Sequence, residues 1–426
     1  MHARPLQQID IDDFPTLNEI RTAHDRLKDV VIRTPLDKNV NLSQRYHGDI
    51  HLKREDLQKV RSYKIRGAYN KISTLSRHAA RAGIVCASAG NHAQGVAYAC
   101  AALEISGTIF MPQPTPMQKI NQVKMFGGNV VDVILVGDTF DDAYQEAALF
   151  ADKHKRELIH PFDDRKIIEG QGTIGLEIVE DLPDPIDYLL VPIGGGGLAS
   201  GVSIVFNRLS PGTRIVGVEP KGAPAMQASL KKDGIVTLDK IDKFVDGAAV
   251  QRVGDATFRI CRQLLDDVIT VDEGEVCSTI LKLYNEEGMV VEPAGALTIA
   301  ALRMLENDIK GKRVVCIVSG SNNDITRMEE IKERSLLFEG LKHYFIVRFP
   351  QRAGALKEFV THVLGPTDDI THFEYSKKNS RERGPALVGI ELRNAADYHS
   401  LIERFNQYGF VFEYLNKSSD LFHYLI

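Results

Sequence analysis

The sequence predicts an α/β fold with parallel-rich sheets, followed by a smaller α+β domain of the ferredoxin-like kind. Two observations carry this prediction. Through residue 321, apolar runs rich in Val and Ile alternate with longer segments of helical period, which is typical of βαβ units. From residue 343 onward, the pattern changes to strand, helix, strand, strand, helix, strand, which is the order of a ferredoxin-like domain.

The apolar runs of the first region are short, nearly continuous and followed by turns. Parallel strands of this kind are buried on both faces, so helices are expected to cover the sheet on both sides. We expect strands at residues 84–89, 105–112, 130–137, 187–193, 214–220 and 313–322, and helices at residues 91–104, 115–126, 139–155 and 194–206.

The second region follows a strongly charged, helix-like segment at residues 323–338. With 426 residues, the chain exceeds the usual size of about 150 residues per domain. We place the boundary near residue 335, so that residues 1–335 form two α/β subdomains, the smaller at roughly 65–165, and residues 336–426 form the second domain. In the second domain we expect strands at 343–350, 369–378, 386–392 and 410–415, and helices within 351–364 and 395–409.

The composition is that of an ordinary globular protein with small-molecule partners. The hydrophobic fraction is 43%, the charged fraction is 26% and the net charge is −5, so no global field favours nucleic acid or an anionic membrane. Neither a signal peptide nor a membrane-spanning run is evident, and we expect a cytoplasmic protein. The five cysteines have no CxxC spacing and mostly lie in apolar runs, which favours buried, reduced thiols over disulfides or a zinc site.

Two polar turns lie where open α/β sheets place their ligands. The turn at residues 62–68 contains Lys64 and follows the polar stretch 53–56, although a lone lysine is usually a solvated surface charge. The turn at residues 88–92 precedes an Ala-rich helix, and its amides are suited to an anion such as a carboxylate. A tight turn with a helix cap explains the second pattern equally well.

The third turn has four consecutive glycines, Gly194, Gly195, Gly196 and Gly197, followed by Leu198. Glycine lets the backbone approach a phosphate closely, and the following helix adds a favourable dipole. The pattern is neither GxGxxG nor a P-loop, so it favours a phosphate-bearing cofactor over a dinucleotide or a nucleoside triphosphate. A flexible turn is the alternative, but each glycine costs about 0.5 to 1 kcal/mol of backbone entropy.

The motifs SYKIRGAY, SAGNHAQGVA, GGGGLASG, VEPAGAL and VSGSNND together resemble the fold-type II pyridoxal-phosphate enzymes, whose fold is that of tryptophan synthase β. The resemblance is greatest to the biosynthetic threonine dehydratases, in the short Bacillus-type form with one regulatory domain, and it covers essentially the whole chain. It implies pyridoxal 5′-phosphate as cofactor and a homotetramer as the assembly.

The resemblance also implies roles for individual residues. Lys64 is similar to the lysine that forms the internal Schiff base, Asn91 to the residue that bonds the cofactor's 3′-oxygen, and Ser319 to the partner of the pyridine nitrogen. Residues Gly194 to Leu198 would hold the phosphate. The substrate carboxylate would lie on the loop formed by Ser88, Ala89, Gly90, Asn91 and His92.

Tyr63 and Glu292 match further active-site segments, and no proton-transfer role is assigned to Glu292. The activity implied is conversion of L-threonine to 2-oxobutanoate and ammonia, with Lys64 removing the Cα proton. The leaving hydroxyl needs an acid, and both the cofactor phosphate and Lys64 are candidates. Some L-serine turnover is expected, because one methyl group is worth only about 1 to 3 kcal/mol in a pocket.

Two other functions compete with this one. An L-serine dehydratase or racemase of the same fold would use the same residues, and the regulatory segment argues against it. A non-catalytic amino-acid sensor would also keep the fold, but Lys64, Asn91, the glycines and Ser319 are all intact.

Metal binding is not expected. In relatives that hold a divalent cation near a GVEP-like segment, a second carboxylate follows within a few residues. Here Glu219 is followed by the residues Lys221 to Ala225, and we predict no divalent requirement.

The second domain resembles the ACT-like regulatory domains. Its turn after the first strand, with Arg352, Gly354, Ala355 and Leu356, is similar to their ligand-binding turn, although a plain turn explains the pattern as well. Because threonine dehydration commits carbon to isoleucine, the resemblance implies feedback inhibition by isoleucine.

Overall fold

The computed structural model describes residues 14–375 and 383–416, which form two units. The first unit contains residues up to 273 together with 283–324, and the second contains 274–282 and the residues from 325 onward. The initial 13 residues lie outside the described part of the chain, as do residues 376–378 of the strand that we expect at 369–378. Helix α14 (Met328–Phe338) spans the boundary expected near residue 335.

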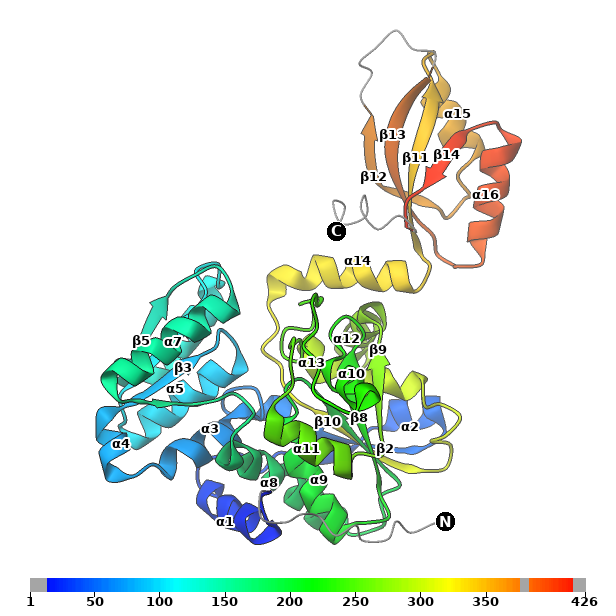
Figure 1. The fold of residues 1–426 in the computed structure, drawn as a ribbon. Helices are drawn as coiled ribbons and strands as arrows, with labels where there is room; N and C mark the ends of the chain where they lie inside the picture. Colours follow the sequence, from blue (N-terminus) through cyan, green and yellow to red (C-terminus); the bar gives the residue numbers. More distant parts are fainter. Residues whose placement is uncertain (1–13, 376–382, 417–426) are drawn as a thin grey trace. The chain divides into compact units, whose positions relative to one another are not determined.

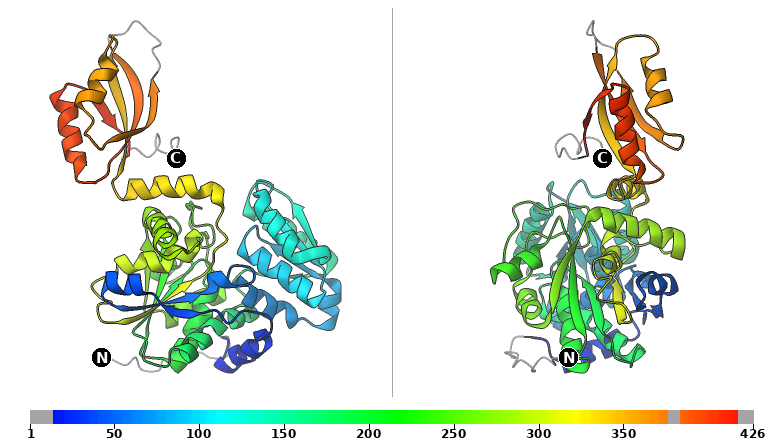
Figure 2. Two further views of the ribbon diagram at one scale, coloured as in Figure 1. Left: turned by 180° about the vertical axis from the view of Figure 1, so that it is seen from behind. Right: turned by 90° about the vertical axis from the view of Figure 1, so that its right-hand side faces the viewer.

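The first unit is built around a large, mostly parallel sheet with the strand order β1-β2-β10-β7-β8-β9. Only β1 is antiparallel to its neighbour. Helices lie on both faces, as Figures 1 and 2 show, so the central strands are inaccessible to water. The strands are β1 (Leu36–Lys38), β2 (Asp49–Arg54), β7 (Tyr188–Pro192), β8 (Arg214–Pro220), β9 (Asp267–Val271) and β10 (Arg313–Val318).

This unit also contains a smaller parallel sheet with the strand order β5-β4-β3-β6. Its apolar strands pack against α5 (Asn91–Leu103) and α7 (Phe140–His154), whose Ala-rich faces permit close approach. The strands are β3 (Ile84–Ala87), β4 (Gly107–Met111), β5 (Val131–Leu135) and β6 (Glu157–Leu158). The expected βαβ alternation at residues 84–155 is therefore confirmed.

Several helices of the first unit begin at side-chain caps. Thr16 and Thr139 form capping boxes at α1 and α7, and Asp164 caps α8. The helices are α1 (Leu17–Leu27), α2 (Val40–Tyr46), α3 (Lys64–Ser73), α4 (Arg77–Ala82), α5 (Asn91–Leu103), α6 (Met117–Gly127), α7 (Phe140–His154), α8 (Arg165–Asp181), α9 (Gly197–Leu209), α10 (Ala225–Lys232), α11 (Asp255–Leu264) and α13 (Pro293–Ala300). Short 3₁₀ turns occur at Glu55–Leu57, Gly128–Val130 and Ala301–Arg303.

Helix α12 (Glu273–Glu287) contributes residues to both units. The second unit has an antiparallel sheet of order β12-β13-β11-β14, with α15 and α16 on one face (Figure 2). A core of aromatic and aliphatic side chains fills the space between them. The elements are a 3₁₀ turn (Ile325–Arg327), α14, β11 (Lys342–Pro350), α15 (Ala355–His362), β12 (Asp369–Tyr375), β13 (Arg383–Glu391), α16 (Asp397–Gln407) and β14 (Val411–Tyr414). The ferredoxin-like order is confirmed.

All five cysteines are free and buried, as expected. No helix in residues 14–375 and 383–416 is both long and apolar enough to cross a membrane.

Candidate active site

Lys64 is the first residue of α3 and its side chain is partly buried. Its Nζ donates a hydrogen bond to the carbonyl oxygen of Pro161 at 3.0 Å and lies 5.4 Å from the centroid of the Tyr63 ring. Burial lowers the pKa of the amine to about 8, although the nearby Glu292 carboxyl acts in the opposite direction. A lysine of this kind has a far larger neutral, and therefore nucleophilic, fraction near neutral pH than an ordinary lysine.

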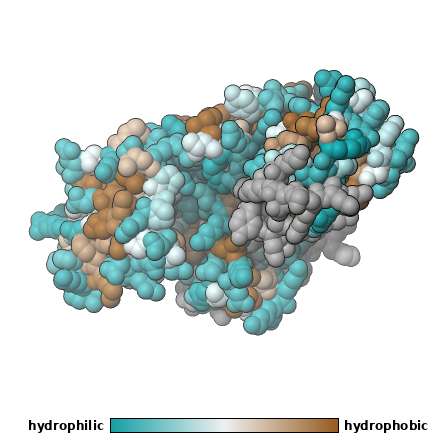
Figure 3. Space-filling model, turned by 90° about the horizontal axis from the view of Figure 1, so that it is seen from above, coloured by the Kyte–Doolittle hydropathy of each residue, from teal (hydrophilic) through white to brown (hydrophobic). Residues whose placement is uncertain are grey.

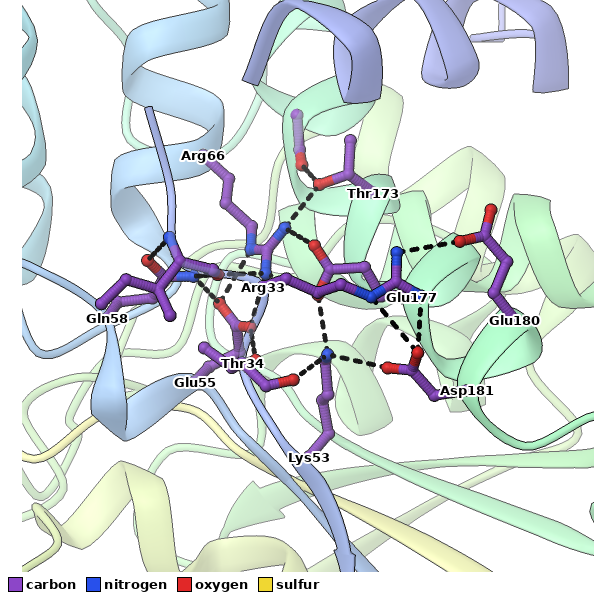
Figure 4. A network of polar contacts seen from close by, with 12 residues as sticks. Arg33, Thr34, Lys53, Glu55, Gln58, Arg66, Thr173, Glu177, Glu180 and Asp181 are labelled. Carbon is purple, nitrogen blue, oxygen red and sulfur yellow. Dashed lines mark hydrogen bonds and ion pairs between the residues drawn. The ribbon is translucent and has the colours of Figure 1, made fainter. Parts of the chain in front are cut away.

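A buried ionic network holds the first turn of α3 (Figure 4). The Arg66 guanidinium pairs with Glu55 and with Glu177, each at 2.7 Å, and all three side chains are inaccessible or nearly so. Lys53 adds a second cation to Glu177 at 2.7 Å and donates to the Thr34 carbonyl at 2.7 Å. The network connects β2 and α8 to the helix on which Lys64 lies, so the position of that lysine is fixed by charged contacts in the interior.

The predicted turn at residues 88–92 follows β3 and opens α5 at Asn91. The N–H of Gly90 donates to the Ser88 hydroxyl at 3.2 Å. His92 is buried, and its Nε2 contacts the carbonyl oxygen of Ile159 at 3.0 Å. Burial lowers the pKa of His92 to about 3, so its ring is neutral, and the carbonyl contact places the proton on Nε2. This turn therefore offers main-chain N–H groups at a helix start without a charged histidine.

Asn91 has partners on both ends of its amide. Its Nδ2 donates to Glu292 Oε1 at 2.7 Å, and its Oδ1 accepts from Asn322 Nδ2 at 2.6 Å. Glu292 is 4% exposed, and burial raises the pKa of its carboxyl to about 7. The structure thus brings together two residues that the sequence assigned to separate segments.

Gly194, Gly195 and Gly196 lie in the turn between β7 and α9, and Gly197 is the first residue of α9. Gly196 has a φ of +95°, which favours glycine, and a methyl group on Gly195 would overlap the ring of Phe162. The Thr257 hydroxyl donates to the carbonyl of Gly195 at 2.6 Å and so orients the loop. Leu198 points into the large core and is 2% exposed, so only its backbone is available to a ligand.

Ser319 follows the last residue of β10 and is 3% exposed. Its carbonyl accepts from the N–H of Tyr63 at 3.2 Å, and the next residue, Gly320, forms an antiparallel bridge with Ser62. Gly320 also accepts from the N–H of Glu292 at 3.2 Å. The segments around Lys64, Glu292 and Ser319 are therefore adjacent, as the predicted strand ends require.

The predicted regulatory residues lie in the second unit. Gly354 has a φ of +86° at the N-cap of α15, and Arg352 pairs with Glu358 of the same helix. Ala355 is buried in the core of the unit, whereas Leu356 is 45% exposed.

Sequence reasoning missed the segment 159–164, although its composition gives a signal. Besides the carbonyls that Lys64 and His92 contact, Asp163 accepts hydrogen bonds from three N–H groups at the start of α11. Asp164 accepts from two N–H groups at the start of α8. Paired aspartates before a helical pattern are a recognisable capping signature, which could have drawn attention to this segment.

Glu219, which the sequence placed in the GVEP segment, is also a helix cap. Its two carboxylate oxygens accept from the N–H groups of Met226 and Gln227 at 2.7 and 2.8 Å. Burial raises the pKa of this carboxyl to about 7. Within the described residues, no group of three His, Cys, Asp or Glu side chains is arranged to hold a metal ion.

The fold and this cluster of residues belong to a known class. Residues 27–320 match the family of pyridoxal-phosphate-dependent enzymes, and residues 333–425 match the C-terminal regulatory domain of threonine dehydratase. The chain belongs to the pyridoxal-phosphate-dependent enzymes, in the branch that carries this regulatory domain.

Individual relatives narrow the comparison. The chain is 57% identical over 410 residues to the biosynthetic L-threonine dehydratase IlvA of Halalkalibacterium halodurans, which covers 96% of this chain and 99% of that protein. The enzyme of the same name from Bacillus subtilis is also 57% identical, over 96% of this chain and 97% of that one.

Solved structures give the same fold. The processed form of threonine deaminase isoform 2 from Solanum lycopersicum is 40% identical with a TM-score of 0.72, over 76% of this chain and 90% of that chain. Maize serine racemase is 32% identical with a TM-score of 0.69, over 75% of this chain and 98% of that chain.

The residues present fit pyridoxal phosphate. The glycine turn leaves bare backbone at the start of α9, where N–H groups and the helix dipole favour a phosphate. Lys64 supplies a partly buried amine of lowered pKa, and the amide of Asn91 retains a second N–H for a ring oxygen. Ser319 supplies a neutral hydroxyl at the end of the neighbouring strand.

Proposed function

We propose that this chain is a pyridoxal-phosphate-dependent L-threonine dehydratase, which converts L-threonine to 2-oxobutanoate and ammonia. The observation that carries the proposal is the 57% identity, over 96% of the chain, to a biosynthetic L-threonine dehydratase. The segments that carry Lys64, Asn91 and Ser319 also meet, since the N–H of Tyr63 donates to Ser319 and the N–H of Glu292, the partner of Asn91, donates to Gly320. This supports the proposal, because the lysine amine can form the link to the cofactor while the other two side chains can bind its ring.

Pyridoxal phosphate, when bound, supplies an aldehyde that links to an amine and a ring that withdraws electrons. We propose that Lys64 holds the cofactor and, once displaced by the substrate amine, accepts the Cα proton at its Nζ. Its lowered pKa supports this role, because a neutral amine is required to take up a proton. Protonated in this way, Lys64 is one candidate acid for the leaving hydroxyl, and the cofactor phosphate is the other.

The remaining predicted residues are proposed to bind and orient. Asn91 would donate to the cofactor's 3′-oxygen, Ser319 would contact the pyridine nitrogen, and the backbone from Gly194 to Leu198 would hold the phosphate. The main-chain N–H groups of residues 88–92 would bind the substrate carboxylate, since the start of α5 favours an anion there. Tyr63 packs beside Lys64 and would limit access of water to its amine.

The test is to add L-threonine to the purified protein and to follow both the visible absorbance and 2-oxobutanoate. We expect a cofactor band, keto-acid formation and loss of both in Lys64→Ala. A cofactor band without threonine turnover would contradict the proposed substrate, and the absence of a band would contradict the roles of Lys64 and its neighbours.

A second candidate is a serine dehydratase or racemase, which the similarity to maize serine racemase favours. The presence of the regulatory domain match over residues 333–425 argues for threonine. Comparison of kcat/KM for L-threonine and L-serine, with a chiral assay for D-serine, separates the two. A higher kcat/KM for serine would replace the first proposal with the second.

We propose that residues 1–335 act as the catalytic domain and residues 336–426 as a regulatory domain that binds isoleucine. The small and glycine residues at the start of α15 support an amino-acid site near Arg352, Gly354, Ala355 and Leu356. Feedback inhibition requires isoleucine to bind one global state better than the other, by about 1 to 3 kcal/mol in typical cases. Removal of residues after 335 should leave a dehydratase that isoleucine no longer inhibits. Full sensitivity of the truncated protein would contradict the assignment.

We also propose a homotetramer in the cytoplasm. Figure 3 shows hydrophobic residues gathered in separate patches on the visible face, and exposed apolar side chains include Phe140 and Leu149 of α7. Such patches are typical of subunit contacts. The free, buried cysteines fit a reducing compartment. Light scattering after gel filtration tests the assembly, and cell fractionation tests the location.

A further inference from the structure

We propose that Glu292 is a positioning residue, which together with Asn322 orients the Asn91 amide so that it presents an N–H, and not its carbonyl oxygen, to the cofactor's 3′-oxygen. This inference rests on the proposed role of Asn91. It gives Glu292 a function that neither its sequence motif nor the family match supplies.

The contacts of the Asn91 amide fix which end is which. Its Nδ2 donates to Glu292 Oε1 at 2.7 Å, and its Oδ1 accepts from Asn322 Nδ2 at 2.6 Å. The main-chain N–H of Asn322 also donates to the Glu292 carboxyl, which closes a ring of three residues. If the Asn91 amide turned over, its oxygen would face the Glu292 carboxyl and its NH₂ would face that of Asn322, and both contacts would be lost.

The orientation of Asn322 is itself anchored to the main chain. Its Nδ2 donates a second hydrogen bond to the carbonyl oxygen of Val60 at 2.9 Å. A main-chain carbonyl is only an acceptor, so the NH₂ end of Asn322 must point toward it. Asn322 therefore donates both to Val60 and to Asn91, and Asn91 in turn donates to Glu292.

Glu292 cannot easily turn away from this ring. It is 4% exposed, and its N–H is held by the carbonyl of Gly320 at 3.2 Å. A methyl group at Gly320 would come within 2.6 Å of Oε1, and one at Gly247 within 3.3 Å, so the carboxyl lies in a space that only glycines leave open. Pro293 at the first position of α13 further limits the backbone.

The chemistry gives this orientation a purpose. A side-chain amide has two N–H donors, and the bond to Glu292 uses one, which leaves the other for the cofactor. The 3′-oxygen is electron-rich in the bound cofactor, so an N–H stabilises it and an amide carbonyl repels it. Glu292 thereby acts through Asn91, whereas a proton-transfer role would require direct contact with substrate or cofactor.

A double-mutant cycle separates these roles, with Glu292→Leu, Asn91→Ala and the double variant compared with wild type. The readouts are the cofactor dissociation constant from equilibrium dialysis and the absorbance spectrum of the bound cofactor across pH. We expect Glu292→Leu to weaken cofactor binding by about tenfold or more, which corresponds to the loss of one hydrogen bond to a charged group, and to shift the spectrum. In the Asn91→Ala background, the same substitution should change neither readout further.

Two variants keep the test decisive if Glu292→Leu folds poorly. Asn322→Ala removes the other partner of Asn91 and should show the same dependence on Asn91. Glu292→Gln keeps an acceptor for Asn91 and should lie closer to wild type than Glu292→Leu. As a matched control, Glu219→Gln alters another buried carboxyl that accepts two N–H bonds, and should leave the spectrum unchanged.

The outcomes distinguish the inference from the function on which it rests. An effect of Glu292→Leu that persists in full without Asn91 would overturn the inference and favour direct action on the cofactor. The inference also fails if Glu292→Leu changes neither readout. If Asn91→Ala leaves affinity and spectrum unchanged, the proposed role of Asn91 fails first and the inference with it.

Discussion

Replacement of Arg66 by methionine should strongly destabilise the first unit. The guanidinium makes four hydrogen bonds of 2.7 to 2.9 Å to Glu55 and Glu177, and all three side chains are buried. Methionine has a similar length but no charge, so Glu55 would lose its cation while Glu177 would keep Lys53. Breaking a buried pair from one side costs about 3 to 5 kcal/mol, because the remaining charge is uncompensated.

A matched control lies in the same network. Arg33 bonds Glu180 and Asp181 with similar geometry, but its side chain is 47% exposed. Arg33→Met should therefore reduce the free energy of unfolding by only about 0 to 1 kcal/mol. The two variants remove the same chemical group and differ mainly in burial.

Urea unfolding of the full chain, followed by circular dichroism and by hydrogen exchange in α3 and α8, measures both losses. Adding Glu55→Gln to Arg66→Met should recover part of the stability, because it removes the stranded carboxylate. The reasoning would be refuted if Arg66→Met and Arg33→Met differed by less than about 1 kcal/mol in the free energy of unfolding.

Three further predictions concern the site. Gly195→Ala should weaken cofactor binding, because the new methyl group would overlap the ring of Phe162. Gly212→Ala, which has open space around it, should leave cofactor binding unchanged, and equal cofactor dissociation constants for the two variants would contradict this prediction. Burial lowers the pKa of Lys64 from 10.5 to about 8, so the neutral amine accumulates as the pH rises through this value. Cofactor uptake by the apoprotein should therefore increase with a midpoint near pH 8, and a midpoint near pH 10.5 would contradict the prediction. A chelator should leave activity unchanged, since both oxygens of Glu219 already cap α10, and magnesium-dependent recovery would show the opposite.

The strands and the three polar or glycine-rich turns could be predicted because their signals are local. Apolar runs at residues 84–87 and 313–318 indicate buried strands, and parallel strands place the turns that follow them at one edge of the sheet. The elements of the second unit could be predicted equally well, because its apolar pattern alternates clearly between strand and helix.

The buried charges could not be predicted in this way. Lys53 and Glu55 were interpreted as part of a polar stretch, since charged residues are rarely buried unless they are paired. Both are 0% exposed, and Lys53 lies in strand β2. Lys53 pairs with Glu177, which lies more than a hundred residues away, and Glu55 pairs with Arg66, which itself bonds Glu177. The pairing that makes burial tolerable is therefore a property of the folded chain.

The hydrogen bond between Asn91 and Glu292 could not be predicted from the sequence for a related reason. Each residue was assigned to the active site from its own motif, but their separation of 201 positions hides the contact. The orientation of the amide depends further on a main-chain carbonyl, that of Val60, which no residue type reveals.

The segment 159–164 has a consequence for mutational scanning. Its contacts to Lys64 and His92 come from the carbonyl oxygens of Pro161 and Ile159, which every substitution retains. Alanine scanning would detect the loss of the helix caps at Asp163 and Asp164. At the neighbouring positions it would report mainly the loss of side-chain packing, and not the contacts made by the main-chain carbonyls. Replacement of a single peptide bond by an ester at the Pro161 carbonyl weakens the acceptor and keeps every side chain, and it would expose the contact. Because the ester also removes the N–H of Phe162, which donates to His160 Nδ1, a His160 variant serves as the control.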